Sequence, residues 1–435
     1  MRLCLVEDGG VSGLEPLTLT RPAFDLRLGA TTLEAKLARA FDIGPGPARR
    51  GCVVRPHLAD IRRSRDPQTV VNSVDWLAKA PTVVANGRWV PPSGFEVPAT
   101  GGTWVGLCDG RPAFAMVGPG DSPGLEPGRV GPWFEDLAAR LDGFDVGGEW
   151  IDRPWDLVTK NGPHIARDFR EGGRVGVSNH HLARLALVGP VDRLFVHETA
   201  QIDPYTVLDT TLGPIIVGPG AIIRPFTRLE GPCVIGRGSV ISRAEIRGGT
   251  TIGPDCRVSG DVEASILHGQ VRKDSGGTLG HAYVGEWVDL GPIASGGASS
   301  DGMLSVSLCG DPIATGQDRV GCFVGDHSRM GPGSVLDSGT SIGVMCNLAP
   351  AGSPVPRHVP SFASLTHGGV APGFDLEELF GAARSAMALH GHDFRESERS
   401  LLLDLFERTR LERERAYQKA DRRRDEPRPA ASAGG

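Results

Sequence analysis

The stretch IIVGPGAIIRPFTRLEGPCVIGRGSVI, residues 215–241, places an aliphatic side chain at every sixth position, at Val217, Ile223, Leu229, Ile235 and Ile241. The stretch FVGDHSRMGPGSVLDSGTSIGVMCNL, residues 323–348, has the same period, at Val324, Met330, Leu336, Ile342 and Leu348. A small residue follows four places later, for example Ala221 and Ser328. A period of six fits neither an α-helix nor an alternating strand. It predicts a solenoid in which every sixth side chain points inward.

Three such hexapeptides make one triangular coil of a parallel β-helix. The aliphatic side chain fills the axis, and glycines such as Gly218 and Gly236 permit unusual backbone angles at the corners. Each coil buries its face only against the next coil, so the array is stable only as a stack. We therefore expect a left-handed β-helix over residues 187–355. A loop-rich β-sandwich with frequent glycine turns is the alternative.

Composition limits the class of protein. The chain has 435 residues, of which 40% are hydrophobic, and a formal net charge of −6, which argues against a nucleic-acid-binding surface. Its first residues do not resemble a secretion signal, and no run of 18 apolar residues predicts a membrane span. The eight cysteines form no CxxC pair, which predicts reduced thiols in a cytoplasmic protein.

Residues 1–175 alternate strand-like and helix-like segments, which predicts an α/β domain with a mostly parallel sheet. Strands are expected at 3–6, 52–54 and 82–85, a hairpin over 104–117, and helices over 31–41 and 133–141. Residues 153–170 are expected to form a helix pair or a helix and a loop. The six-residue period breaks between about 265 and 321, and such interruptions tend to be functional loops. In the extension 372–420, two amphipathic helices (374–390 and 398–420) are expected to cap the last coil.

Several residues could carry chemistry. Arg21, Arg27 and Lys36 follow the first expected strand, where cations can hold phosphate oxygens; the alternative is that they are surface or carboxylate-paired cations. The glycines of residues 8–13 could cradle a phosphate. His281, near the end of the break, could act as a general base because an imidazole titrates near neutrality; the alternative is a structural histidine.

Four stretches together resemble a known family. They are LTLTRPAFDLRLGATTLEAK (17–36), WDLVTKNGPHIARDF (155–169), LGHAYVGEWVDLG (279–291) and CFVGDHSRMGPGSVLDSGTSIG (322–343). In this combination the chain resembles the GlmU-like sugar nucleotidyltransferases of the alternative bacterial type. The resemblance implies a nucleotidyltransferase-like α/β domain joined to a left-handed β-helix acyltransferase domain. It also implies two activities, UDP-N-acetylglucosamine diphosphorylase and glucosamine-1-phosphate N-acetyltransferase.

The resemblance also implies roles for single residues. His281 falls at the acetyltransferase base, Tyr283 at a sugar-phosphate contact and Ala349 at a backbone contact to acetyl-CoA. Asp289 stands where the family has Asn, and Arg21 and Lys36 would bind substrate. The implied co-reactants are a nucleoside triphosphate, a sugar 1-phosphate, acetyl-CoA and Mg²⁺. Coenzyme A lies between neighbouring β-helices in the family, so a homotrimer is implied; no nucleic-acid or membrane partner is expected.

The Gly-rich LxxGxGTRM loop of the better-known GlmU enzymes, with its following Pro-Lys pair, is absent here, as it is in the alternative type. The sequence departs from the alternative type at two places. Lys273-Asp274-Ser275-Gly276-Gly277 stands in place of a Lys-Ala-His-Asp-Gly run, and an Asn-Tyr pair is replaced by SSDGMLSVS. Two alternatives therefore stay open. One is a β-helix acyltransferase with a non-catalytic nucleotide-binding domain, and the other is a trimeric scaffold or regulator without catalysis.

Overall fold

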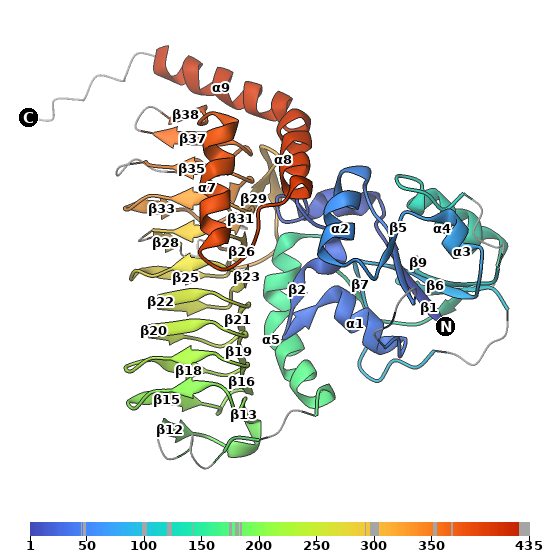
Figure 1. Ribbon diagram of the computed structural model, residues 1–435, viewed down its shortest axis with the longest axis horizontal. Coiled ribbons are helices and arrows are strands. Elements are labelled where there is room, and N and C mark those ends of the chain that lie inside the picture. The colour runs from blue at the N-terminus through green and yellow to red at the C-terminus, as the bar shows by residue number, and fades with distance from the viewer. Residues whose placement is uncertain are drawn as a thin grey trace, which may run out of the picture.

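The computed structural model describes residues 1–44, 46, 49–97, 102–119, 124–141, 143–173, 176–178, 182, 185–291, 293–295, 304–350, 355–366 and 369–425. It confirms an α/β domain followed by a parallel-stranded β-helix of the left-handed hexapeptide type and by C-terminal helices. Figure 1 shows the N-terminal domain lying beside the tube and the C-terminal helices lying at its far end. None of the described helices is long and apolar enough to cross a membrane.

The N-terminal domain is built on one sheet with the strand order β10-β8-β9-β6-β1-β4-β5. The strands are β1 (Arg2–Val6), β4 (Arg50–Val53), β5 (Val70–Val71), β6 (Thr82–Asn86), β8 (Trp104–Cys108), β9 (Arg111–Val117) and β10 (Gly143–Asp145). All neighbours are parallel except β9, which runs antiparallel to β6 and β8 and so confirms the predicted hairpin. The helices of this domain are α1 (Leu33–Ala40), α2 (Ala59–Arg65), α3 (Val74–Leu77) and α4 (Val130–Arg140).

One continuous helix, α5 (Pro154–Glu171), connects this domain to the tube. The prediction of a helix pair or a helix and a loop for this segment was therefore wrong. Pro154 is in the first turn, where its missing N–H costs nothing. Pro163 lies inside the helix but does not end it, because burial of one apolar face, including Leu157 and Ile165, holds the helix in place.

The β-helix has three faces. Face 1 comprises β13 (Leu194–Val196), β16 (Ile215–Val217), β19 (Cys233–Ile235), β21 (Thr250–Ile252), β23 (Ile266–Gly269), β26 (Tyr283–Glu286), β31 (Phe323–Val324), β34 (Ser341–Ile342) and β36 (His358–Val359). Face 2 comprises β14 (Gln201–Ile202), β17 (Ile222–Ile223), the first parts of β20 (Val240–Ile246) and β22 (Arg257–Glu263), β24 (Arg272–Lys273), β27 (Asp289–Leu290), β32 (Arg329–Met330), β35 (Asn347–Leu348) and β37 (Ala363–Thr366). Face 3 comprises β12 (Leu185–Val188), β15 (Thr206–Asp209), β18 (Arg228–Glu230), the second parts of β20 and β22, β25 (Thr278–Gly280), β28 (Ile293–Ser295) and β33 (Ser334–Leu336).

The ten six-residue positions quoted from the sequence all point into the tube and are at most 4% exposed. The break in the pattern is narrower than predicted. The strands continue in register through β28, and the insertion lies between β28 and β31, where it carries the hairpin β29 (Ser305–Leu308) and β30 (Asp311–Ala314). Within this range Lys273 occupies an inward position that the pattern gives to aliphatic residues, so the six-residue period does not reveal this coil.

Among the described residues that follow the tube there are three helices, α7 (Leu376–Ala388), α8 (Glu396–Arg408) and α9 (Arg410–Asp425). The single helix predicted over 398–420 was wrong, because the chain turns at Thr409, whose hydroxyl donates to the carbonyl of Leu405. Figure 1 shows α9 lying across the end of the tube beside β38 (Gly369–Pro372), the antiparallel partner of β37. The last strands of the array are therefore covered, as a solenoid end requires.

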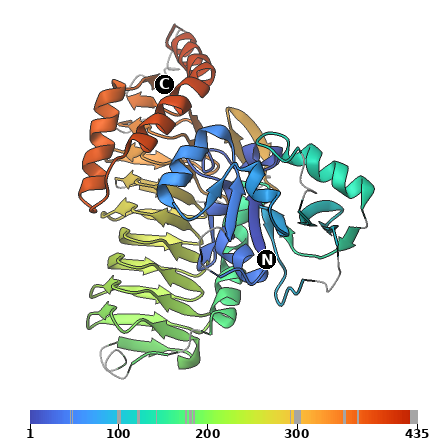
Figure 2. The same cartoon turned by 45° about the vertical axis from the view of Figure 1, so that its right-hand side comes forward.

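The outward side chains of face 1 form a mostly apolar column. In order of strand register they are Phe195, Ile216, Val234, Thr251, Ile266, Tyr283, Phe323, Ser341 and His358. Helix α5 packs Ile165 and Phe169 onto Ile216 and Val234, and further along the column Trp155 lies 6.3 Å from Phe323 between ring centroids. The N-terminal domain therefore covers face 1, as Figures 1 and 2 both show.

Candidate functional site

The cations predicted to bind phosphate lie at the contact between the N-terminal domain and face 1. Arg21 is 2% exposed and forms ion pairs with Asp326 and, at 3.3 Å, with Glu286. The hydroxyl of Thr20 donates to Asp326 over 2.6 Å. Burial opposes the charged form of Asp326, but Arg21 and Thr20 outweigh it and lower the pKa of that carboxyl. Arg21 therefore joins the two domains through a buried ion pair.

Tyr283 belongs to the same contact. Its side chain is fully buried, and its hydroxyl accepts from the backbone N–H of Arg27 over 2.9 Å. The hydroxyl also lies 2.9 Å from Nδ1 of His268, while Nε of Arg27 donates to the carbonyl of His268 over 2.7 Å. Burial, and after it Arg21, lowers the pKa of His268 well below its usual value, so this ring is neutral. The expected sugar-phosphate contact of Tyr283 remains a prediction, since the structure gives its hydroxyl protein partners.

Lys36 is also buried and paired. Its Nζ lies 2.7 and 2.6 Å from the two carboxylate oxygens of Asp168 on α5. One of these oxygens also accepts from the backbone N–H of Ala30 over 2.8 Å. Gly29 has a φ of +70°, and a Cβ there would lie 2.4 Å from the Asp168 carboxylate, so this turn requires glycine. Arg21 and Lys36 thus match the carboxylate-paired alternative, and their binding of phosphate stays a prediction.

Asn161 completes the contact between α5, the loop at Gly29 and the tube. Its Oδ1 accepts from the N–H of Gly29 over 2.7 Å, and its Nδ2 donates to the carbonyl of Gly249 over 2.7 Å. The hydroxyl of Thr251, on face 1, donates to the carbonyl of Gly29 over 2.9 Å. Two of the stretches that carry the family resemblance, 17–36 and 155–169, therefore pack directly on the tube.

The glycine-rich segment after β1 is not an open loop. Residues Gly9–Leu14 form a short 3₁₀ helix whose first N–H groups are capped by Asp8. The guanidinium of Arg88 binds both oxygens of Asp8 over 2.8 and 2.7 Å, and a Cβ at Gly10 would lie 2.2 Å from that guanidinium. Arg88 also pairs with Asp152, which Arg111 binds over 2.8 Å.

This group of Asp8, Arg88, Arg111 and Asp152 lies beyond the carboxyl ends of β1 and β6, where open α/β sheets bind ligands. Asp152 and Arg111 are more than 40% exposed, so a ligand could reach them. Of this group, the sequence pattern indicates only the Asp8 segment. Arg88 directly follows the Asn86-Gly87 turn after a buried strand, a signal that could have identified it.

No group of three or more His, Cys, Asp or Glu side chains within the described ranges could hold a metal ion. Asp8 and Asp152 are the carboxylates nearest to the expected nucleotide site, and both are already bound by Arg88. As arranged here they do not offer the open carboxylate oxygens that Mg²⁺ prefers. The Mg²⁺ prediction is untested, and we derive no step through a metal.

His281 lies at the corner between face 3 and face 1, directly after β25. Its φ is +51°, and its backbone is held by the carbonyl of Glu263 and the N–H of Gly321. Its Nε2 is buried and has no hydrogen-bond partner among the described residues. Burial lowers the pKa of the imidazole, and Arg319 adds to this, while Glu263 opposes it. The ring is therefore neutral at pH 7 and has one nitrogen free to accept a proton.

The altered segment 273–277 places an ammonium group inside the tube. Lys273 is fully buried, and its Nζ donates to the carbonyls of Ser259 and Gly277 over 2.5 and 2.8 Å. Burial lowers its pKa to about 8, although Asp261 opposes this shift. The carbonyls of the corner therefore replace the apolar contacts that an aliphatic residue would make.

The two remaining predicted site residues lie apart from His281. Asp289 points outward from face 2, in register between Arg272 and Arg329. Ala349 is exposed at the end of β35, and its N–H donates to the carbonyl of Leu365 over 2.7 Å. The structure does not bring either residue to His281 within this chain, and their predicted contacts are untested.

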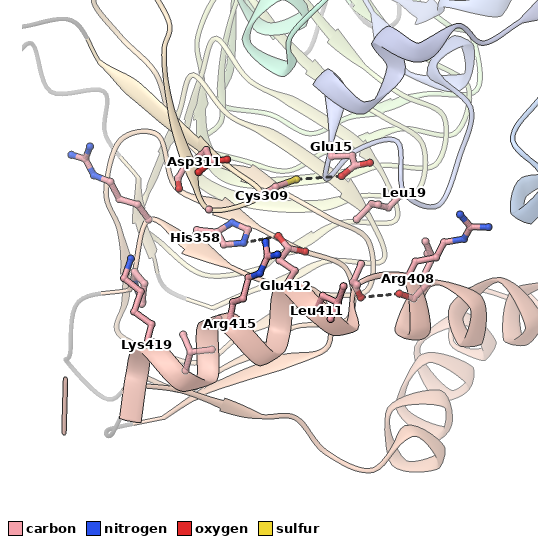
Figure 3. A pocket seen from close by; sticks show the side chains of 18 of the residues that line it. Glu15, Leu19, Cys309, Asp311, His358, Arg408, Leu411, Glu412, Arg415 and Lys419 are labelled. Atoms are coloured by element: carbon pink, nitrogen blue, oxygen red, sulfur yellow. Dashed lines mark hydrogen bonds and ion pairs between the residues drawn. The ribbon is translucent and has the colours of Figure 1, made fainter. Parts of the chain in front are cut away.

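A cavity of about 1070 Å³ opens at the far end of face 1 (Figure 3). Its walls come from the N-terminal domain (Glu15, Leu19), the hairpin tip (Cys309, Asp311), β36 (His358) and helices α8 and α9 (Arg408, Glu412, Arg415, Lys419). His358 Nε2 lies 2.8 Å from the Glu412 carboxylate. The sequence analysis did not predict this cavity, because its walls are distant in the chain.

Comparison with known proteins agrees with the two-part architecture. Residues 3–174 match the family described as "Sugar nucleotidyl transferase". The YaiX proteins of Escherichia coli strains K12 and 536, both described as uncharacterized acetyltransferases, are each 29% identical to this chain, over 175 and 178 residues. The matches cover 33% and 34% of this chain and 67% and 68% of those proteins.

Solved structures of acyltransferases are also similar. The UDP-N-acetylglucosamine acyltransferase of Francisella novicida is 15% identical, with 47% of this chain and 74% of that chain covered and a TM-score of 0.25. The polySia-specific acetyltransferase NeuO is 14% identical, with 48% and 96% covered and a TM-score of 0.26.

Proposed function

We propose that the β-helix transfers an acetyl group from acetyl-CoA to an amine or hydroxyl of a sugar phosphate, with His281 as the general base. The observation that carries this proposal is the free, buried Nε2 of His281 at a coil corner. The acetyltransferase relatives and the family resemblance around residues 279–291 support it.

In the proposed reaction the acceptor nitrogen or oxygen attacks the thioester carbonyl, forming a new N–C or O–C bond. The acceptor proton passes to Nε2 of His281, the C–S bond breaks, and the proton then passes to the departing thiolate of coenzyme A. Because the pKa of His281 is lowered, the base is unprotonated at pH 7. The acid limb of the rate should therefore lie below the usual imidazole pKa of about 6.5.

The test is thioester cleavage with glucosamine 1-phosphate and a panel of related acceptors. His281→Ala should lower kcat by about 10²–10⁴-fold, the usual contribution of a general base. His197→Ala is the matched control, because His197 lies at a corner of the first coil and contacts Thr199. Intact turnover in a folded His281→Ala protein would refute the assignment.

A second candidate function belongs to the N-terminal domain, in which a sugar 1-phosphate oxygen would attack the α-phosphorus of UTP and release pyrophosphate. The match of residues 3–174 favours it. The pairing of Arg21 and Lys36 with carboxylates instead favours a domain that binds a nucleotide without turnover. Pyrophosphate release with UTP and several sugar 1-phosphates tests the two possibilities, and nucleotide binding without release would exclude catalysis.

We also propose that the protein is a homotrimer with acetyl-CoA held between neighbouring tubes and in contact with Ala349. On the tube side away from the N-terminal domain, Figures 1 and 2 show helix α7 beside the upper coils and no helix beside the lower coils, which leaves room there for neighbouring copies. Light scattering should give a mass three times the 45.9 kDa of one chain. A mass of one chain with full acetyl transfer would contradict this arrangement.

A further inference from the structure

The cavity at the end of face 1 is separate from His281 and from the group around Arg88, and it is formed by six segments of the chain, from Glu15 to Ala420. Its volume of about 1070 Å³ is that of a site for a mid-sized ligand. The cavity is bounded by the N-terminal domain, the β29–β30 hairpin, β36 and helices α8 and α9. A ligand there would contact both the N-terminal domain and the C-terminal helices.

The lining carries more positive than negative charge. Five cations, Arg55, Arg357, Arg408, Arg415 and Lys419, face three carboxylates, Glu15, Asp311 and Glu412. Arg55, Arg357 and Arg408 each pair with a carboxylate outside the lining, and Glu412 lies beside His358. Arg415 and Lys419 have no ion-pair or hydrogen-bond partner among the described residues, so their charges are available to a ligand.

Helix α9 directs these two cations to the cavity. Leu411, Arg415 and Lys419 are spaced four residues apart, and so are Glu412, Ala416 and Ala420, so all six lie on one face of the helix. Figure 3 shows the side chains of Arg415 and Lys419 on the same side of α9 as His358. The charged positions on the rest of the helix, such as Arg410 and Arg422, do not line the cavity.

Of the two histidines in the lining, His358 has unused hydrogen-bonding capacity. Nδ1 of His358 is buried and has no hydrogen-bond partner among the described residues, and the ring of His57 is buried with the backbone of Leu19 as its neighbouring polar group. Such an orphaned buried polar atom is rare in proteins and points to a missing partner. A ligand oxygen is a suitable partner for a ring nitrogen that carries a proton.

The uncharged residues of the lining limit the chemical nature of the ligand's body, which is the part without phosphate. Leu19, Val370 and Leu405 supply an apolar wall, while no aromatic ring of the described residues lines the cavity apart from the two imidazoles. A planar base would have no indole or phenyl ring on which to stack. Guanidinium and ammonium groups together favour phosphate oxygens.

From this arrangement we infer that the cavity binds a phosphate ester with at least two negative charges and a saturated body, such as a sugar phosphate. The phosphate lies against Arg415 and Lys419 on α9, and the body lies against Leu19 and Leu405. This site is distinct from the acetyl-transfer site of the proposed function. Its occupation stabilises the packing of the N-terminal domain against the C-terminal helices, because it binds only when both are in place.

The alkylation rate of Cys309 can be used to measure whether the cavity is occupied. All eight cysteines lie in the described ranges, and Cys309, at the hairpin tip in the cavity wall, is the exposed one. Its sulfur lies 3.4 Å from the carboxylate of Glu15. Alkylation by iodoacetamide therefore reports on this wall with little contribution from the seven buried thiols.

The experiment titrates inorganic pyrophosphate and glucose 1-phosphate into the full chain and records calorimetry, melting temperature and the alkylation rate of Cys309. We expect saturable binding, a rise in melting temperature of a few degrees and slower alkylation. Arg415→Ala/Lys419→Ala should weaken binding by at least about tenfold, because it removes charge-assisted hydrogen bonds. Arg410→Ala/Arg422→Ala removes the same charge from the same helix and should leave binding unchanged.

Equal affinity of the two double variants would overturn the inference, and so would binding that leaves Cys309 alkylation unchanged. Preference for decanoate over both phosphates would also overturn it, because the cavity would then hold a fatty acid. If the double variant is unstable, Lys419→Glu replaces it in the experiment. This single substitution keeps the helix intact and should abolish binding. His281→Ala should bind pyrophosphate normally, so failure of acetyl transfer and failure of this site can be distinguished.

Discussion

Face 1, which the N-terminal domain covers, and the corner that carries His281 both contain polar side chains. The two places differ in whether these side chains have hydrogen-bond partners. Where the N-terminal domain covers face 1, Arg21 and Tyr283 are buried, and the Arg21 guanidinium and the Tyr283 hydroxyl both have protein partners. At the corner beside face 3, His281 is half-buried and its Nε2 has no partner in the described structure. Satisfied buried groups stabilise a contact, whereas a buried polar atom without a partner needs an explanation, for which a role in chemistry is a candidate.

The difference teaches how to interpret the family resemblance. Residues 17–36 and 155–169 contain the contacts that hold the N-terminal domain on the tube, including Lys36–Asp168 and Asn161–Gly249. A stretch shared with an enzyme family can therefore record how two domains pack as well as how substrate is bound. The assignment of each residue then needs a measurement that separates stability from turnover.

The largest effect should come from Arg21→Met on face 1. It leaves the buried carboxylate of Asp326 without its cation, while Glu286 keeps Arg65 at 3.5 Å, and the loss should cost about 3–5 kcal/mol of stability. Denaturant unfolding measures this, with Arg63→Met as control because Arg63 is an exposed partner of Asp60. Arg21→Met/Asp326→Leu should recover much of the loss. A loss below about 1 kcal/mol would mean that the pair does not hold the domains together.

Tyr283→Phe should cost about 1–3 kcal/mol, because the N–H of Arg27 and Nδ1 of His268 lose their buried partner. Turnover by the folded fraction should stay near the native level. Tyr205→Phe is the control, since Tyr205 is 76% exposed. Lost turnover with unchanged stability would reverse this assignment and return Tyr283 to substrate binding.

Lys273 provides a smaller, pH-dependent effect inside the tube. Its folded pKa of about 8 lies below the usual value of about 10.4 in an unfolded chain. Between these pH values the unfolded state binds more protons, so the contribution of Lys273 to stability rises with pH and is least favourable below pH 8. The melting temperature of the native protein relative to Lys273→Met should therefore rise by a few degrees from pH 7 to 10. A constant difference would show that the ammonium is not desolvated.

The smallest stability effect should come from His281→Ala, at most about 0.5 kcal/mol, because its Nε2 makes no hydrogen bond and its ring is only half-buried. Thermal unfolding beside the acetyl-transfer assay measures both properties. A loss above about 2 kcal/mol in the free energy of unfolding would identify His281 as a structural residue. The proposed difference between face 1 and the corner at His281 would then be wrong.

Much of the fold could be predicted, because a regular structural repeat is visible as a regular pattern in the local sequence. The positions from Val217 to Ile241 and from Val324 to Leu348 point into the tube as predicted. The errors arose where one residue breaks a local rule that its tertiary contacts override. Lys273 occupies an inward position and Pro163 lies inside α5, yet strand pairing and apolar packing preserve both elements.

The candidate site was less predictable, because charge pairing depends on residues far apart in the chain. Arg21 and Asp326 are 305 residues apart, and Arg88 joins Asp8 to Asp152 across the domain. One signal could have been recognised. The outward positions of face 1, such as Ile216, Val234 and Phe323, are apolar where a solvated coil would be polar, which indicates a covered face.

The sequence by itself determined the triangular tube, because a six-residue period admits one way of burying every sixth side chain. It also determined the α/β character of residues 1–175, because strand and helix periods alternate there. Only the tertiary structure decided which cations are neutralised, which histidine nitrogens are free and where the cavity beside α9 opens. Those properties depend on which groups exclude water from one another, and that is set by packing between segments that the sequence keeps far apart.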